Sequence, residues 1–144
     1  KNSETAITGL SVNIIPKFSN IRIRLQAQFF CELGEEGNTY NNMISFMRDS
    51  TGLHESAVGT RNYGYGTLTR TIGSTDVGTS SESACIFDYD SPSTTSQVTY
   101  KLAIRVYIDV SGTDTLAINR IATDGDYPYV EYGISQISAT EIKQ

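Results

Sequence analysis

The chain has 144 residues, a length that fits one domain able to bury roughly two thirds of its unfolded surface without disulfides or metals. Its 16 acidic and 11 basic residues give a net charge of -5, which argues against nucleic acid or an anionic membrane as a partner. All apolar runs are shorter than the ~18 residues of a membrane-spanning helix, so membrane insertion is not expected. The chain opens on Lys1 without a signal peptide, and we interpret it as a processed or excised part of a longer protein.

Short apolar runs separated by Gly, Pro, Ser and Thr run along the whole chain, and no stretch has the apolar spacing of an amphipathic helix. The expected strands, in chain order, are residues 11–15, 20–33, 42–48, a short one near 53–58, then 65–72, 82–90, 98–110, 115–119 and 134–142. Antiparallel strands of this number and length predict an all-β, two-sheet sandwich that forms a single domain over residues 1–144.

Two of these strands, 20–33 and 98–110, alternate between apolar and polar positions, so one face of each strand should be buried. The predicted core includes Ile23, Leu25, Phe29, Leu102, Ile104 and Val106. The opposite positions carry long side chains, and we expect them to form one surface that meets a neighbouring copy of the chain. The members of this surface are Arg22, Arg24, Gln26, Gln28, Phe30, Lys101, Arg105 and Tyr107.

Several short motifs occur together in this chain. In the second half they are Ser91-Pro92-Ser93-Thr94-Thr95-Ser96 before Thr99-Tyr100-Lys101-Leu102, then Ile118-Asn119-Arg120, Asp124-Gly125-Asp126-Tyr127, and Gly133-Ile134-Ser135-Gln136-Ile137 running to Glu141-Ile142. In the first half, residues 10–16, 21–29 and the turn Phe46-Met47-Arg48-Asp49 fit the same series. With these motifs the chain resembles the C-terminal jelly-roll module of fibre and spike proteins of tailed phages.

The resemblance implies the jelly-roll topology of tumour necrosis factor-like domains and a homotrimer that belongs to the virion, assembles in the host cytoplasm and contacts other virion proteins. It also implies a head domain that binds the host surface, with a surface glycan as the candidate receptor. The alternative is a capsid decoration, knob or assembly protein that has no ligand of its own.

The sequence contains no phosphate loop, no Gly-x-Ser-x-Gly elbow and no distinctive pair of carboxylates, so we expect neither an enzyme nor a cofactor. His54 is the only histidine and has no neighbouring Cys, which favours a solvated turn residue over a zinc ligand. The acidic stretches 88–90 and 124–126 favour turns, with calcium binding as the alternative. Cys31 and Cys85 fall at mid-strand positions expected to face the core, which favours buried free thiols over a disulfide.

The chain has nine Tyr and no Trp, and several Tyr fall in expected loops. A Tyr ring offers an apolar face and a hydroxyl at low entropy cost, which suits sugar or protein surfaces. The candidate receptor-binding residues are Arg61, Asn62, Tyr63, Tyr65, Asp124, Asp126, Tyr127 and Tyr129, and the loop 73–81 is a further candidate surface. The alternative is that these rings pack at subunit interfaces or brace loops.

Overall fold

The computed structural model describes residues 4–34, 41–53, 64–67, 81–107, 115–122, 125–128 and 130–143. These residues contain strands and no helix, so no described helix could cross a membrane. The strands are β1 (Glu4–Ile14), β2 (Arg22–Gly34), β3 (Asn41–Arg48), β4 (Thr51–Gly52), β5 (Glu82–Asp90), β6 (Val98–Tyr107), β7 (Thr115–Ile118) and β8 (Gln136–Ile142).

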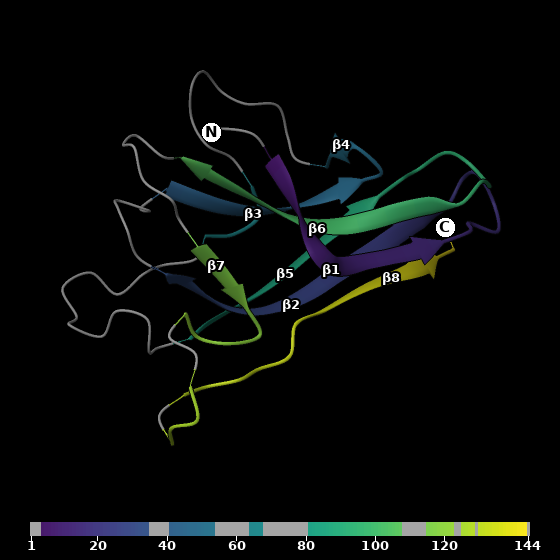
Figure 1. Ribbon diagram of the computed structural model, residues 1–144. Helices are drawn as coiled ribbons and strands as arrows, with labels where there is room; N and C mark the ends of the chain where they lie inside the picture. Colours follow the sequence, from purple (N-terminus) through teal and green to yellow (C-terminus); the bar gives the residue numbers. More distant parts are fainter. Residues whose placement is uncertain are drawn as a thin grey trace.

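The strands form two antiparallel sheets packed face to face (Figure 1). The first sheet has the order β1-β6-β3-β4. In the second sheet β2 is central, with β5 along one edge and both β7 and β8 along the other. β8 pairs with β2 from Arg22 to Gln28, and β7 pairs with β2 from Cys31 to Gly34. The predicted all-β, two-sheet sandwich is therefore confirmed.

The strand pairs are nested along the chain. β3 pairs with β4, β2 with β5 and β1 with β6, so each pair encloses the previous one in the sequence. Successive pairs fall alternately into the first and the second sheet. The first six strands thus form a long antiparallel ribbon that is folded over on itself.

The core lies between the sheets and consists mainly of alternate residues of β2, β3 and β6. In β2 the apolar residues point inward and their polar neighbours point to the outer face, because successive side chains of a strand alternate between the two faces of the sheet. The core prediction is confirmed for Ile23, Leu25, Phe29, Leu102 and Ile104, which are all buried, whereas the side chain of Val106 lies outside the described part.

The start of β1 differs from the prediction. β1 begins at Glu4 rather than at residue 11, because a bulge between Ala6 and Ser11 shifts its register and interrupts the alternation. Gly9 lies in this stretch with a φ of 85°, a conformation that favours glycine. The expected strands near 53–58 and 65–72, and His54, lie largely or wholly outside the described residues.

Two predictions about side-chain direction are wrong. Cys85 is exposed rather than buried, because β5 turns the neighbouring Ile86 into the core; Cys31 is buried as predicted, and both thiols are free. Lys101 and Arg105 do not share a surface with the exposed side chains of β2. Because β2 and β6 belong to different sheets and both point their apolar residues inward, their polar side chains lie on opposite outer faces of the sandwich.

Candidate functional site

The edge of β2 changes its partner at Phe30, between β8 and β7. Asn119 follows β7, and its amide donates to the Phe30 carbonyl at 2.9 Å. Asn119 has a φ of 64°, a left-handed conformation that Asn adopts more readily than most residues. In this conformation its carbonyl accepts from the Gly133 amide at 3.0 Å, and its side-chain oxygen accepts from the Ser135 amide at 2.6 Å.

Ser135 completes this junction. Its hydroxyl accepts from the Phe30 amide at 2.9 Å and donates to the Phe30 carbonyl at 3.1 Å, so one side chain replaces the strand that is missing at this position. Gly133 crosses the Phe30 ring so closely that a Cβ atom would overlap the ring. The motifs that contain Asn119, Gly133 and Ser135 therefore meet in one hydrogen-bonded junction, although 16 residues separate Asn119 from Ser135.

The described part of the segment between β7 and β8 carries several exposed apolar side chains. The side chains of Tyr127, Tyr132 and Ile134 are 56%, 64% and 79% exposed, and Asp126 is exposed as well. The segment is tied to the start of β5, because the hydroxyl and the amide of Ser81 both donate to the carboxylate of Glu131. These two hydrogen bonds, the one from the hydroxyl first, hold the pKa of Glu131 below its usual range.

Asp126 and Tyr127 are the predicted receptor-binding residues that the structure places in this exposed segment. Arg61, Asn62, Tyr63, Asp124 and Tyr129 lie outside the described residues, and so does the loop 73–81 except for Ser81. The exposed Ile134 was missed by the sequence analysis, because it falls in the apolar phase of the strand expected over 134–142.

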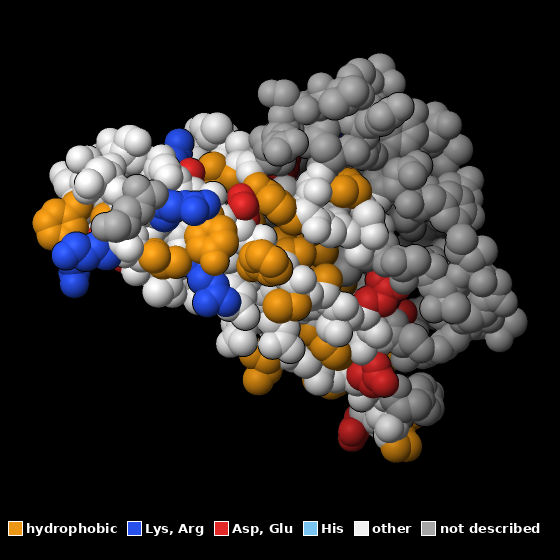
Figure 2. Space-filling view, turned by 180° about the vertical axis from the view of Figure 1, so that it is seen from behind, with side chains coloured by type: hydrophobic (Ala, Val, Ile, Leu, Met, Phe, Trp, Pro, Cys, Tyr) orange, Lys and Arg blue, Asp and Glu red, His pale blue; other side chains and the backbone are white. Residues whose placement is uncertain are grey.

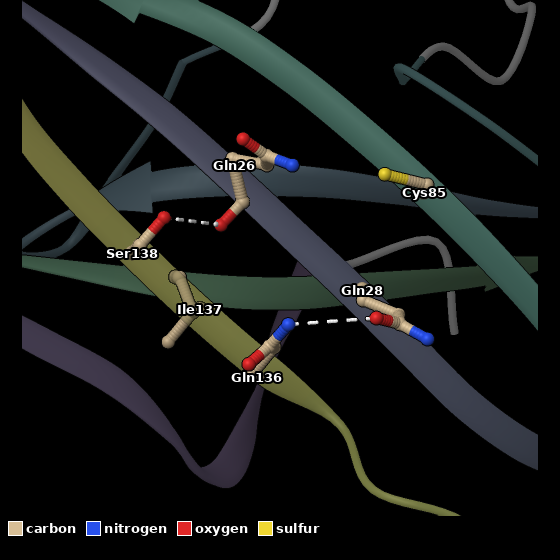
Figure 3. Close-up of a pocket in the computed structure, with 6 residues that line it drawn as sticks. All are labelled: Gln26, Gln28, Cys85, Gln136, Ile137 and Ser138. Carbon is tan, nitrogen blue, oxygen red and sulfur yellow. Dashed lines mark hydrogen bonds between the residues drawn. The ribbon is translucent and has the colours of Figure 1, made fainter.

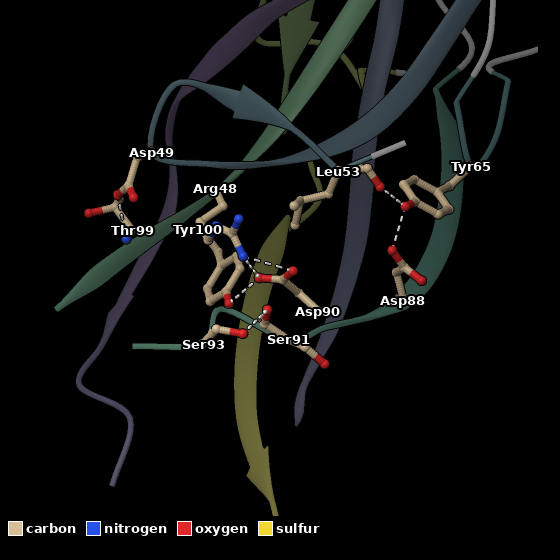
Figure 4. A network of polar contacts seen from close by, with 10 residues as sticks. All are labelled: Arg48, Asp49, Leu53, Tyr65, Asp88, Asp90, Ser91, Ser93, Thr99 and Tyr100. Atoms are coloured by element: carbon tan, nitrogen blue, oxygen red, sulfur yellow. Dashed lines mark hydrogen bonds and ion pairs between the residues drawn. The ribbon is translucent and has the colours of Figure 1, made fainter. Parts of the chain in front are cut away.

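Tyr65 occupies a different environment. Its ring is half-buried and packs against Phe46 with 5.8 Å between the ring centroids. Its hydroxyl is placed to donate to the carboxylate of Asp88 or to the carbonyl of Leu53 (Figure 4). Burial, together with the hydrogen bond to Asp88, raises the pKa of Tyr65 above its usual range. This geometry fits the alternative interpretation, in which a Tyr ring braces the fold.

Arg48 of β3 and Asp90 of β5 form an ion pair that joins the two sheets, on the same side of the sandwich as Tyr65 and Asp88 (Figure 4). Arg48 Nη1 lies 3.0 and 2.8 Å from the two Asp90 oxygens, and the buried Tyr100 donates to Asp90 Oδ2 at 2.7 Å. Asp88 and Asp90 belong to β5 rather than to a turn, and both carboxylates contact partners within the protein. Within the described ranges, no cluster of three or more potential metal ligands occurs.

A hollow of about 280 Å³ opens on the outer face of the second sheet (Figure 3). It is lined by Gln26 and Gln28 of β2, Cys85 of β5, and Gln136, Ile137 and Ser138 of β8. The Gln136 side-chain amide donates to Gln28 Oε1 at 3.4 Å, and the Ser138 hydroxyl lies 3.4 Å from the Gln26 carbonyl. The hollow was not expected from the sequence, because Cys85 was predicted to face the core. In the structure Cys85 lies on the outer face of β5 together with the exposed Phe87 and Tyr89.

Comparisons of the chain with protein-family models, curated proteins and solved structures found no match. The features that bear on function are therefore the fold, the exposed segment between β7 and β8, the hollow and the motif resemblance. The described side chains of the segment and the hollow offer aromatic rings, amides and hydroxyls. Such groups recognise sugars and proteins by stacking and hydrogen bonding.

Proposed function

We propose that this chain is the head domain of a tailed-phage fibre or spike, a homotrimer in the virion that binds the surface of the host. The proposal rests on the motif resemblance, and two features of the fold support it. A jelly roll is a folded antiparallel ribbon, and the nested pairs β3·β4, β2·β5 and β1·β6 fit that topology. In addition, two of the resembling motifs contact each other at the Asn119 junction.

The observation that carries the binding role is the exposed segment between β7 and β8. Tyr127 and Tyr132 present exposed rings, while Asn119, Gly133 and Ser135 fix the base of the segment to the centre of β2. A rigid scaffold that presents exposed loop residues is how sandwiches commonly carry recognition. The rings can stack on sugar faces, and three copies in a trimer would raise avidity without new contacts.

The test is adsorption to the bacterial host of particles that carry Tyr127→Ala together with Tyr132→Ala. We expect adsorption to fall about tenfold or more, because the loss of ~1.4 kcal/mol per site already changes affinity tenfold. Folding and native mass should not change, because both rings are largely exposed. Phe18→Ala is the matched control, since Phe18 is 57% exposed in the turn between β1 and β2, at the opposite end of β2.

If the double variant adsorbs as well as the wild type, this segment is not the receptor site. Normal adsorption combined with defective particle assembly would favour the capsid decoration or assembly role instead. Tyr65 is left out of the test because its contacts with Phe46 and Asp88 make loss of stability the expected result of its substitution.

A further inference from the structure

The outer face of the second sheet differs in composition from the rest of the molecule. Figure 2, seen from the side opposite to Figure 1, shows apolar side chains (orange) next to basic side chains (blue) on this face. Phe87 is 66% exposed and Tyr89 is 41% exposed, although both belong to a regular strand. The outward-facing positions of β2 up to Gln28, of β5 and of β8 contain no Asp, Glu or Lys, in a chain with 16 acidic residues.

This composition is typical of a surface that becomes buried against another protein. Interface centres are enriched in aromatic residues and Arg, and depleted in Lys, Glu and Asp. The two Arg side chains of the face already have neutral partners. The Arg22 guanidinium lies 4.6 Å over the centre of the Tyr89 ring, and Arg24 donates to Gln26 at 3.1 Å. The lining of the hollow itself contains no Asp, Glu, Lys or Arg, so an apolar side chain of a second copy can enter it without meeting a charge.

A projecting ring and a recess lie next to each other on this face. Phe87 is the direct cross-strand neighbour of Gln26, and Cys85 is that of Gln28, so the ring stands at the rim of the hollow. A cavity of roughly 150 Å³ is enough to hold a benzene ring. The hollow, at about 280 Å³, can therefore receive a Phe side chain, whose ring would contact the Cys85 sulfur and the stems of the Gln side chains.

We propose that the outer face of β5, β2 and β8 is the surface through which copies of this chain associate, with Phe87 of one copy seated in the hollow of the next. When each copy inserts its ring into a different neighbour, rather than two copies exchanging rings, the contact is head-to-tail and closes into a ring if the rotation permits. This inference rests on the proposed homotrimer and assigns its contact surface. It excludes the opposite face, which carries Lys101 and Arg105, from the contact.

The test uses the natural thiol in the hollow. In Phe87→Cys, the new thiol should meet Cys85 of the neighbouring copy, and a mild oxidant such as copper phenanthroline should link most chains into covalent trimers. A disulfide within one chain cannot form, because residues two apart on a strand lie about 6.6 Å apart, whereas disulfide Cβ atoms lie about 4 Å apart. Cys31 does not interfere because it is buried. The controls are the wild type, in which Cys85 is exposed and Cys31 is buried, and Phe87→Cys with Cys85→Ser.

Covalent trimers that require both thiols support the proposal, whereas linkage that stops at dimers contradicts the ring. A native trimer in which the introduced thiol forms no disulfide with Cys85 would overturn the assigned face and leave the homotrimer standing. A wild type that is monomeric, together with no linkage in Phe87→Cys, would overturn both. Binding of a neutral hexasaccharide to the monomeric wild type, followed through the Gln26 and Gln28 amide signals, would reassign the hollow to a sugar. Receptor binding is tested separately, since the Tyr127 and Tyr132 variants leave this face intact.

Discussion

The two cysteines occupy opposite faces of the second sheet, and this difference determines their chemistry. Burial raises the pKa of Cys31 to about 12, with smaller contributions from the charges of Glu82 and Glu32. Because the thiolate is the reactive form, a raised pKa removes the nucleophile over the whole neutral range. Cys85 is exposed in the hollow, so its access to reagents depends on whether another copy covers it.

We predict that Cys31 stays unreactive toward a thiol reagent in the native chain, and that raising the pH from about 7 to 9 does not change this, because that range lies far below its pKa. Cys85 should react, and faster in Phe87→Asp than in the wild type, because the proposed association covers the hollow. Thiol titration with and without denaturant measures both rates, and Cys85→Ser identifies which thiol reacts. Rapid labelling of Cys31 in the native state would show that its strand is not packed as described.

At the scale of strands, the junction at Phe30 lets one edge of β2 pair with two different strands. It depends on the left-handed conformation of Asn119 and on its side-chain oxygen, which accepts from Ser135. Both requirements are met by Asp, only the first by Gly, and neither by Ala.

We predict that Asn119→Ala lowers the free energy of unfolding by about 2 kcal/mol, combining backbone strain with one lost hydrogen bond. Asn119→Gly should cost about half as much, and Asn119→Asp least of all. Urea unfolding of the three variants gives this order directly. Equal stabilities for the Ala and Asp variants would mean that the junction does not stabilise the fold.

The contact between β3 and β5 is the second feature at this scale. The side chains of Arg48 and Asp90 are only 29% and 12% exposed, and Tyr100 supplies the other hydrogen bond to Asp90. Removing the Arg leaves a largely buried carboxylate with one neutral donor, which is more costly than removing the hydroxyl.

We therefore predict that Arg48→Met lowers the free energy of unfolding by about 1.5–3 kcal/mol and Tyr100→Phe by about 1 kcal/mol. The double variant should depart from the sum of the two, because both side chains bond to the same carboxylate. Lys17→Met, at an exposed position, serves as the control for loss of a positive charge. If Arg48→Met behaves like this control in thermal unfolding, the ion pair does not hold the sheets together.

The sequence predicted β2, β3, β5 and β6 well, because these strands carry regular alternation and pair along most of their length. It misjudged the direction of Cys85 because the inward phase of β5 contains Asp88 and Asp90. These residues look like surface residues until their partners Tyr65 and Arg48 are known. The junction at Asn119 and the hollow could not be predicted, because both arise from strand pairs that are distant in the sequence.

At the scale of the whole molecule, the two outer faces of the sandwich are not equivalent. The face of β5, β2 and β8 exposes Phe87 and Tyr89 beside a hollow, whereas the opposite face carries Lys101 and Arg105. The exposed segment with Tyr127 and Tyr132, which we propose as the receptor-binding part, lies between β7 and β8. In the proposed trimer, assembly and recognition therefore use separate parts of the chain.

The most direct test of this account is the native mass of the purified chain, measured by light scattering across micromolar concentrations. We predict the mass of a trimer for the wild type and for Ser11→Asp, which adds a charge at an exposed position on the opposite face. Phe87→Asp should give the mass of a monomer with an unchanged strand signal in circular dichroism, because the substituted ring is exposed in the single chain. A monomeric wild type, or a Phe87→Asp variant that remains trimeric, would contradict the account.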